Sequence, residues 1–371
     1  MTPAAALDDL TIVDFSRVLA GPLATMVLAD LGATVIKVER GGWDPIGDDT
    51  RAWGPPFDER GQATYFQSVN RNKTSEVLDL TTEAGAARAR ELAARADVVV
   101  ENFRPGVMDR LGLGYDALAA QRPALIYASI TGFGAGAGAA LPGYDLLVQA
   151  VGGLMSITGE ADGEPQKVGV ALVDVITGLF AAVGIVAALR HRDRTGEGQR
   201  VEIDLLSSLL AALVNQGSAF TLAGAVAGRM GNAHPSIAPY ELVPTGDGDL
   251  VLAVGNDKQF AALCAVVGLG EDARFATNAS RVAHREELRE ALVAALASRS
   301  ADHWVRALSP VGVPAGVVND VAGAFELATQ LGLDPIVELP REDGSVARLT
   351  RNPIRMSATP PQYRTAPPDL P

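Results

Sequence analysis

Apolar and polar residues follow two alternating patterns in the first third of the chain. Short runs rich in β-branched residues, typical of buried strands, occur at 11–16, 34–40, 75–80, 97–103 and 124–132. Longer helix-like stretches separate them, such as the one that Thr82 and Glu83 open. Strands that are apolar on both faces and alternate with helices are typical of a parallel sheet covered by helices. The pattern therefore predicts an α/β fold.

Residues 133–222 are predicted to be mainly helical, apart from polar loops at 159–167 and 190–199. Within them, the segment 168–189 contains one ionisable side chain, that of Asp174. A run of this length could span a bilayer. The carboxylate seven residues in, and the absence of an aromatic belt, favour instead a helix buried in a folded core. We therefore expect no membrane partner.

A second unit is predicted after residue 225. Around residues 240–255 the sequence predicts a hairpin closed by Gly246-Asp247-Gly248. Three helical runs follow, at 257–268, 284–298 and 301–309. These elements indicate a smaller α+β unit at about 225–325, and the segment 334–354 again resembles strands.

The composition limits the partners of the chain. Of its 371 residues 48% are hydrophobic, so it can bury a large core, and its formal net charge is −13. Such an acidic chain is not expected to bind nucleic acid or anionic membranes. The single cysteine, Cys264, excludes a disulfide framework, and no histidine has a partner at metal-ligand spacing, so we expect no metal site. The N-terminus lacks the charged start and apolar run of a signal peptide, which predicts a cytoplasmic protein.

Asp174 is the sharpest chemical signal. Burying an ionised carboxylate without a partner costs several kcal/mol, so its place in an apolar run needs an explanation. One explanation is a helix N-cap, because Asp is a favoured cap and a good helical sequence follows. The other is a nucleophile in a dry site. The two are compatible, because a helix N-terminus is expected to lower the proton affinity of a carboxylate.

Basic residues stand near several predicted strand ends. Lys37 and Arg40 end the second strand, and Arg104 and Arg110 follow the fourth. Since ligands bind at the carboxyl ends of parallel strands, these cations could gather phosphates, or could form a solvated rim. Arg71 and Lys73 precede the third strand, so their place at the crevice is less clear.

The glycine-rich run 131–143 follows a strand, but its spacing misses the G-x-G-x-x-G fingerprint. It is either a loop that lies close to a ligand or a plain connection.

Several longer motifs together resemble one known family. They include DFSRVLAGPLATMVLADLGATVIKVER, NRNKTSEVLDL, ENFRPGVMDRLGLGYDAL, PGYDLLVQAVGGLMSITG, GVALVDVITGL and RTGEGQRVEIDLL. In this order they are similar to the class III coenzyme A transferases, which include formyl-CoA and carnitine CoA-transferases and have alpha-methylacyl-CoA racemase as a relative. The resemblance covers roughly residues 8–355.

The resemblance implies an interlocked homodimer. Each chain would form a Rossmann-like large domain from 1–200 and 330–371, a linker helix at 201–230 and a small domain at 231–325. Asp174 stands at the position of the family's catalytic aspartate, in GVALVDVITG, and would be the nucleophile.

The resemblance also implies a path for coenzyme A, as a substrate and not a tightly bound cofactor. The positions that carry over as contacts are Val18, Arg40, Leu78, Asp79, Leu80, Thr81, Asn102, Phe103, Arg104, Arg110, Tyr144 and Asp145.

Two departures bear on the substrate. Formyl-CoA transferase has a glutamine where this chain has Leu19, which argues against a formyl/oxalate pair. It also has a longer glycine-rich loop in the region where only 228–235 stands here. In that segment Arg229 could grip a distal carboxylate, and His234 could approach one or could cap local backbone. The sequence GNAHPSIAPY in this region resembles the branch of the family that uses succinyl-CoA or other dicarboxylic acyl-CoA donors.

The resemblance therefore implies transfer of CoA from an acyl-CoA to a small carboxylic acid, through an aspartyl anhydride and an aspartyl-CoA thioester. One alternative is racemisation of a 2-methylacyl-CoA, which needs two opposed bases. This chain has Tyr144 and Asp257 where the racemase branch has its histidine and glutamate, and a phenol is a poor base at neutral pH. A non-catalytic acyl-CoA-binding protein is the other alternative.

Overall fold

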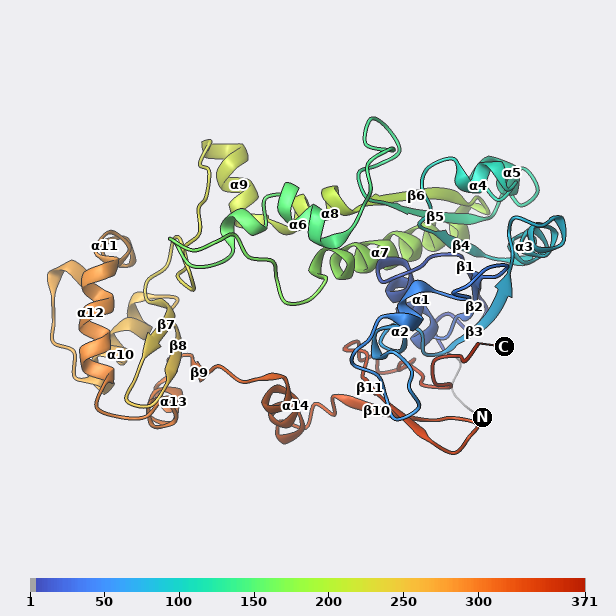
Figure 1. The fold of residues 1–371 in the computed structure, drawn as a ribbon. Coiled ribbons are helices and arrows are strands. Elements are labelled where there is room, and N and C mark those ends of the chain that lie inside the picture. The colour runs from blue at the N-terminus through green and yellow to red at the C-terminus, as the bar shows by residue number, and fades with distance from the viewer. Residues whose placement is uncertain (1–4, 371) are drawn as a thin grey trace. The chain divides into compact units, whose positions relative to one another are not determined.

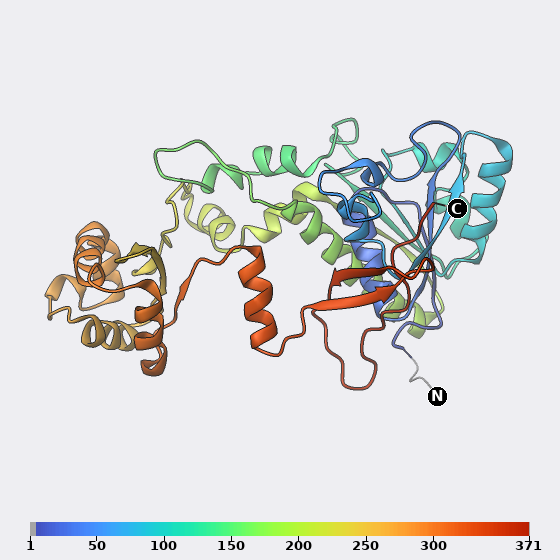
Figure 2. The same ribbon diagram turned by 60° about the horizontal axis from the view of Figure 1, so that its bottom comes forward.

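The computed structural model describes residues 5–370, which divide into two compact units. The large unit contains the residues up to Leu154, then Lys167–Ala225 and the residues from Asp334 onward. The small unit contains Met155–Gln166 and Val226–Leu333. Figures 1 and 2 show the elements of both units from two sides.

A six-stranded, all-parallel sheet forms the centre of the large unit. Its strands are β1 (Thr11–Asp14), β2 (Thr34–Arg40), β3 (Lys73–Leu78), β4 (Val98–Glu101), β5 (Ile126–Thr131) and β6 (Gln199–Asp204). They lie in the order β3-β2-β1-β4-β5-β6, and Ile12 of β1 is in register with Val35 on one side and Val98 on the other. The predicted α/β class is confirmed. In this order the chain reverses direction across the sheet between β1 and β4, which is where such sheets bind ligands.

Alternate residues of each strand pack under helices on opposite faces of the sheet. Ile12, with other buried residues of its face, packs against helices α1 (Ala20–Asp30) and α7 (Leu172–Thr195). Its neighbour Val13 packs on the other side, with α3 (Glu83–Arg95), α4 (Val107–Arg110) and α5 (Tyr115–Ala119). Figure 2 shows these helices on both sides of the sheet. Because the strands are buried on both faces, their sequences are continuous apolar runs.

The prediction of a loop at 190–199 is wrong, because a helix and a strand occupy most of this segment. Helix α7 continues through its charged end to Thr195 and stops at Gly196, whose φ of 79° lies in the left-handed region. Strand β6 then begins at Gln199, where no strand was predicted. Its alternation is that of an edge strand, with Val201 and Ile203 packed on the core and charged residues between them.

Further elements of the large unit surround this sheet. They are α2 (Thr64–Gln67), α6 (Asp145–Val151), α8 (Leu205–Ala212), α9 (Val214–Ala223), the 3₁₀ helix η1 (Asp49–Ala52) and the antiparallel pair β10 (Ile336–Pro340) and β11 (Val346–Thr350). The segment 201–230, predicted as one linker helix, therefore holds the end of β6, two helices and an irregular stretch. The C-terminal segment packs on the large unit, where the Arg364 guanidinium donates to the carbonyls of Ala29, Gly32 and Ala33.

The small unit contains the predicted hairpin and the three predicted helices. Strands β7 (Tyr240–Pro244), β8 (Asp249–Ala253) and β9 (Ala315–Val317) form an antiparallel sheet. The helices are α10 (Asp257–Val267), α11 (Asn278–Ala283), α12 (Arg285–Leu296), α13 (Ala301–Leu308) and α14 (Val321–Gln330), and the 3₁₀ helices η2 (Met155–Ile157), η3 (Ala273–Phe275) and η4 (Ser309–Val311) also belong to it. The unit has its own apolar core around Leu250, Leu292 and Trp304.

By length and hydropathy, α7 is the single unbroken helix among the described residues that could cross a membrane. One of its faces packs in the core through Ala181 and Ile185. The bent pair α8 and α9 passes the same test only when it is counted as one span.

Candidate active site

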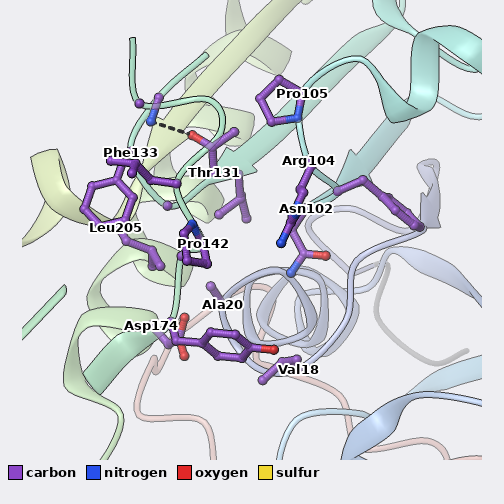
Figure 3. Close-up of a pocket in the computed structure, with 18 of the residues that line it drawn as sticks. Val18, Ala20, Asn102, Arg104, Pro105, Thr131, Phe133, Pro142, Asp174 and Leu205 are labelled. Atoms are coloured by element: carbon purple, nitrogen blue, oxygen red, sulfur yellow. Dashed lines mark hydrogen bonds between the residues drawn. The ribbon is translucent and has the colours of Figure 1, made fainter. Parts of the chain in front are cut away.

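A cavity of about 240 Å³ opens at the point where the sheet order reverses. The segments that follow β1 and β4, residues 17–20 and 102–105, line it from adjacent strand ends. In Figure 3 the labelled residues come from these segments, from the end of β5 and the loop after it, from α7 and from α8: Val18, Ala20, Asn102, Arg104, Pro105, Thr131, Phe133, Pro142, Asp174 and Leu205. Asp174 therefore lies at the carboxyl edge of the sheet, where the fold concentrates ligand contacts.

Asp174 is not the N-cap of α7, which corrects one of the two sequence interpretations. It is the third residue of the helix, and the cap position belongs to Ala171, which has no side-chain acceptor. The carboxylate of Asp145, the first residue of α6, caps the start of α7 instead. It accepts the backbone N–H groups of Val173 at 2.8 Å and Asp174 at 3.3 Å. The Gln149 side chain donates to the other oxygen of Asp145 at 2.6 Å and fixes its orientation.

Burial and, to a smaller extent, the nearby carboxylate of Asp145 together raise the pKa of Asp174 to about 7. The expectation that the helix start would lower its proton affinity is therefore wrong in sign. Loss of hydration and a like charge both favour the neutral acid, and together they outweigh the positive end of the helix. A carboxyl with this pKa changes its charge near neutral pH, and its ionised form is a stronger nucleophile than an ordinary aspartate.

Replacing Asp145 by Asn should move the acid limb of activity to lower pH. The substitution removes the like charge while Oδ1 still accepts the two N–H groups of α7, at the cost of the hydrogen bond from Gln149. The pKa of Asp174 then falls, so its ionised form persists at more acidic pH. The pH profile of kcat/KM checks this. An unchanged limb in an active Asp145→Asn variant would contradict the electrostatic role of Asp145.

The glycine-rich run forms part of the cavity wall, and its closeness to a ligand stays a prediction. Nine of its residues between Thr131 and Gly143 line the cavity. Gly132 and Gly143 pack backbone against backbone, and a Cβ on either would lie 2.4 Å from the Cα of the other. Larger residues would therefore push the loop apart and open this wall of the cavity.

A second cavity of about 390 Å³ adjoins the first, and Arg17 and Phe103 line both. Of the predicted coenzyme A contacts, the second cavity is lined by Arg40, Leu78, Asp79, Leu80, Thr81, Phe103 and Arg110. The first is lined by Val18, Asn102, Phe103, Arg104 and Tyr144, together with Leu19. Asp145 lines neither cavity, because its carboxylate is turned to α7.

Three of the basic residues near strand ends lie in the interior, which corrects the phosphate hypothesis for Lys37 and places Arg71 and Lys73 away from both cavities. The Lys37 ammonium is fully buried and pairs with Asp48 at 2.8 Å. Arg71 pairs with Asp30 at 2.6 Å, and Lys73 reaches Asp14 at 3.2 Å. Their spacing along the strands did not reveal these acidic partners, which are distant in the sequence.

Arg229 and His234 belong to the small unit. The Arg229 guanidinium donates to the carbonyls of Glu160 and Gly163, and so holds the loop 155–166 against the segment after residue 226. His234 Nδ1 accepts the backbone N–H of Ser236, the local capping arrangement, and its ring lies 5.4 Å from that of Tyr240. Their roles toward a substrate stay predictions.

Two further residues of this region, Tyr65 and Arg17, were missed by the sequence analysis. Burial raises the pKa of Tyr65, and the carboxylates of Asp174 and Asp145 raise it further, so its phenol lies in the electrostatic field of the site. Arg17 lines both cavities, with its guanidinium 5.0 Å from the Phe103 ring centre. A tyrosine in a loop and one arginine among several basic residues carry no distinguishing pattern in a single sequence.

The chain belongs to the CoA-transferase family III, whose family model matches residues 7–371. It is 45% identical to the succinate–glutarate CoA-transferase of Agrobacterium fabrum, over 98% of this chain and 92% of that protein. It is 41% identical to the acetyl-CoA:oxalate CoA-transferase of Acetobacter aceti, over 96% of this chain and 90% of that protein. A solved CAIB/BAIF family protein from Brucella suis has a TM-score of 0.87 and 44% identity, covering 99% of this chain and 97% of the other. The chain is therefore a CoA-transferase.

Proposed function

We propose that this enzyme transfers CoA from succinyl-CoA to a dicarboxylic acid, with Asp174 as the nucleophile. The observation that carries the proposal is the cavity at the sheet reversal, into which one carboxyl with a pKa near 7 projects beside a second, nucleotide-sized cavity. The name of one relative contains the dicarboxylates succinate and glutarate, and that of another pairs acetyl-CoA with the dicarboxylate oxalate. This supports a dicarboxylic substrate class for the chain.

In the proposed reaction the Asp174 carboxylate attacks the thioester carbonyl of the donor and expels CoA thiolate. The product of this step is an anhydride between Asp174 and the donor acyl group. The thiolate then attacks the aspartyl carbonyl, which releases the donor acid and leaves an aspartyl-CoA thioester. The acceptor carboxylate repeats both steps in reverse. Covalent catalysis thus divides a difficult exchange into steps between activated acyl groups.

The start of α1 is the proposed donor for the oxyanions that form in these steps. Leu19 and Ala20 line the cavity, and the helix has no side-chain cap or acidic residue in its first turn. Backbone N–H groups at such a helix end stabilise developing negative charge. The apolar side chain of Leu19 would also help to exclude water, which would otherwise hydrolyse the anhydride.

The second cavity is the proposed site of the nucleotide part of CoA. Apolar side chains of Val38, Leu78 and Leu80 form a slot suited to a flat base, beside Trp43. Among residues 5–370 the guanidinium groups of Arg104 and Arg110 have no carboxylate partner, so both are available to phosphates. The pantetheine arm would then pass Arg17 and Phe103 into the first cavity.

Intact-protein mass spectrometry after mixing with succinyl-CoA, with borohydride and hydroxylamine trapping, tests the proposal. We expect a CoA adduct or trapped modification that maps to Asp174 and is discharged by dicarboxylic acids such as glutarate. Discharge by monocarboxylic acids alone would contradict the substrate class. Absence of any adduct, together with deuterium exchange at the α-carbon of a 2-methylacyl-CoA, would contradict the transferase mechanism.

We also propose that the enzyme is a homodimer. Apolar side chains on α7 and α9 are exposed in the single chain, including Val183 at 67%, Phe220 at 60% and Leu222 at 87%. Exposed apolar surface of this kind is typical of an interface. Sedimentation equilibrium should therefore give twice the chain mass of 38.5 kDa, and a monomer at micromolar concentration would contradict the proposal.

A further inference from the structure

The turn between β1 and α1, residues 16–19, has an unusual backbone. Val18 has a φ of 71°, in the left-handed region that β-branched residues rarely adopt. The same residue lines the catalytic cavity, next to Leu19 and Ala20. A strained residue persists only where the surrounding structure fixes it, and such residues concentrate at functional sites.

Side chains of the surrounding elements hold the backbone of this turn. Ser16 N–H donates to Asp14 at 2.9 Å, and the Ser16 carbonyl accepts from the Lys37 ammonium at 3.0 Å. Asn102, directly after β4, accepts the N–H of Arg17 at 2.9 Å and donates to its carbonyl at 2.8 Å. The turn therefore takes its shape from β1, β2 and β4, and not from contacts within itself.

The N–H group of Val18 points to Asp48, at 3.3 and 3.4 Å from its two carboxylate oxygens. Asp48 is buried, and its carboxylate also accepts the N–H and hydroxyl of Thr50 and the ammonium of Lys37 at 2.8 Å. Glu39 fixes Asp48 further by accepting its backbone N–H at 2.8 Å. The Lys37–Asp48 pair thus binds the turn at two points, the carbonyl of Ser16 and the N–H of Val18.

Neither Lys37 nor Asp48 lines either cavity, so neither touches a ligand there. We propose that Lys37 and Asp48 are positioning residues for the transferase reaction, and that they hold the Val18 turn, and with it the start of α1, against the nucleophile. The inference rests on the proposed function, because it assigns the pair a role at the same site. Without the pair, Val18 relaxes to negative φ and the N–H groups at the start of α1 leave their positions.

The test compares two double variants that each remove a buried ion pair without leaving a single charge. Lys37→Met with Asp48→Leu removes the proposed positioning pair. Arg71→Met with Asp30→Leu is the matched control, because this pair is equally buried in the same unit and lines neither cavity. The measurements are kcat and KM with succinyl-CoA and glutarate, the Tm, and a crystal structure of the first variant.

We expect kcat of the Lys37/Asp48 variant to fall at least about tenfold further than kcat of the control, at similar Tm. The KM for succinyl-CoA should change much less, because the lost contacts orient the reacting groups. The crystal structure should show Val18 at negative φ. Equal kcat losses in both variants, or an unmoved turn with positive φ, would overturn the inference. If the double variant does not fold, Asp48→Asn, which retains the acceptor for Thr50, is measured by the same criteria. A wild type without transfer activity would overturn the proposed function, and the Val18 φ would still decide the role of the pair.

Discussion

Replacing Asp174 by Ala is expected to lower kcat/KM for CoA transfer by about 10⁴-fold or more, because no other group in the cavity replaces a covalent nucleophile. Asp49 also lines the cavity, but it pairs with Arg40 at 2.9 Å. Asp145 lies outside the cavity lining, and it accepts the N–H groups of α7 at Oδ1 and the Gln149 amide at Oδ2. Binding of free CoA should remain, since the predicted nucleotide contacts lie in the second cavity. Initial rates with succinyl-CoA and glutarate, together with calorimetric CoA binding, measure both effects.

Asp193→Ala provides the matched control for this prediction. Asp193 is an exposed carboxylate near the other end of the same helix, so its loss should leave both activity and CoA binding unchanged. Residual transfer in Asp174→Ala above about one percent of wild type would refute the assignment of the nucleophile. Equal loss of CoA binding would show that the substitution disturbs the fold and not the chemistry alone.

The sheet could be predicted from sequence because its strands are buried on both faces. In residues 98–100, Val98 and Val100 are buried on one face of the sheet and Val99 on the other, so the run has no polar side, and the helices between the strands begin at clear caps, such as Thr82. Strand β6 was missed because it lies at the edge of the sheet, where Arg200 and Glu202 interrupt the apolar pattern. Edge strands carry polar residues for solvent, and in a single sequence they resemble loops.

The cavity residues could be predicted only in part. The apolar context of Asp174 already marked it, and the resemblance to a family added many residues of both cavities, whereas physical reasoning from spacing treated Lys37 and Arg40 alike. In the structure Lys37 is buried against Asp48, while Arg40 lines the second cavity and pairs with Asp49 at 2.9 Å. Such a difference depends on which acidic side chain the fold brings near, and a pattern along one strand contains no information about that.

The position of the cap on α7 could not be predicted for a similar reason. Asp174 follows an irregular segment and precedes a helical run, so by local rules it is a good cap. The actual cap is the carboxylate of Asp145, 29 residues before Asp174, which accepts N–H groups of the first turn of α7. Because another helix supplies the cap, the Asp174 carboxylate has no hydrogen-bond or ion-pair partner among residues 5–370, which leaves it available for the proposed chemistry at the expense of stability.

Replacing Asp174 by Asn is therefore expected to stabilise the protein above neutral pH while it abolishes transfer. The pKa of Asp174 is raised from 3.8 to about 7 in the folded state, chiefly by burial and then by Asp145. A carboxyl with a raised folded pKa contributes stability below the unfolded pKa, and this contribution is lost as the pH rises through the folded value. At one pKa unit per 1.36 kcal/mol, wild type loses up to about 4 kcal/mol between pH 4 and 7 from this group, whereas the neutral amide loses none.

Thermal unfolding of wild type and Asp174→Asn from pH 4 to 9 measures this effect. The Tm values should coincide near pH 4, diverge as the pH rises, and reach a constant difference above about pH 7, with the variant the more stable. Asp193→Asn, which removes an exposed carboxylate from the same helix, should show no divergence. A Tm difference independent of pH would mean that the amide acts through packing. An Asn variant less stable than wild type at pH 8 would refute the claim that burying the ionised Asp174 carboxylate destabilises the fold. The predicted divergence follows from the same buried charge that makes the carboxylate reactive, so stability and catalysis oppose each other at this residue.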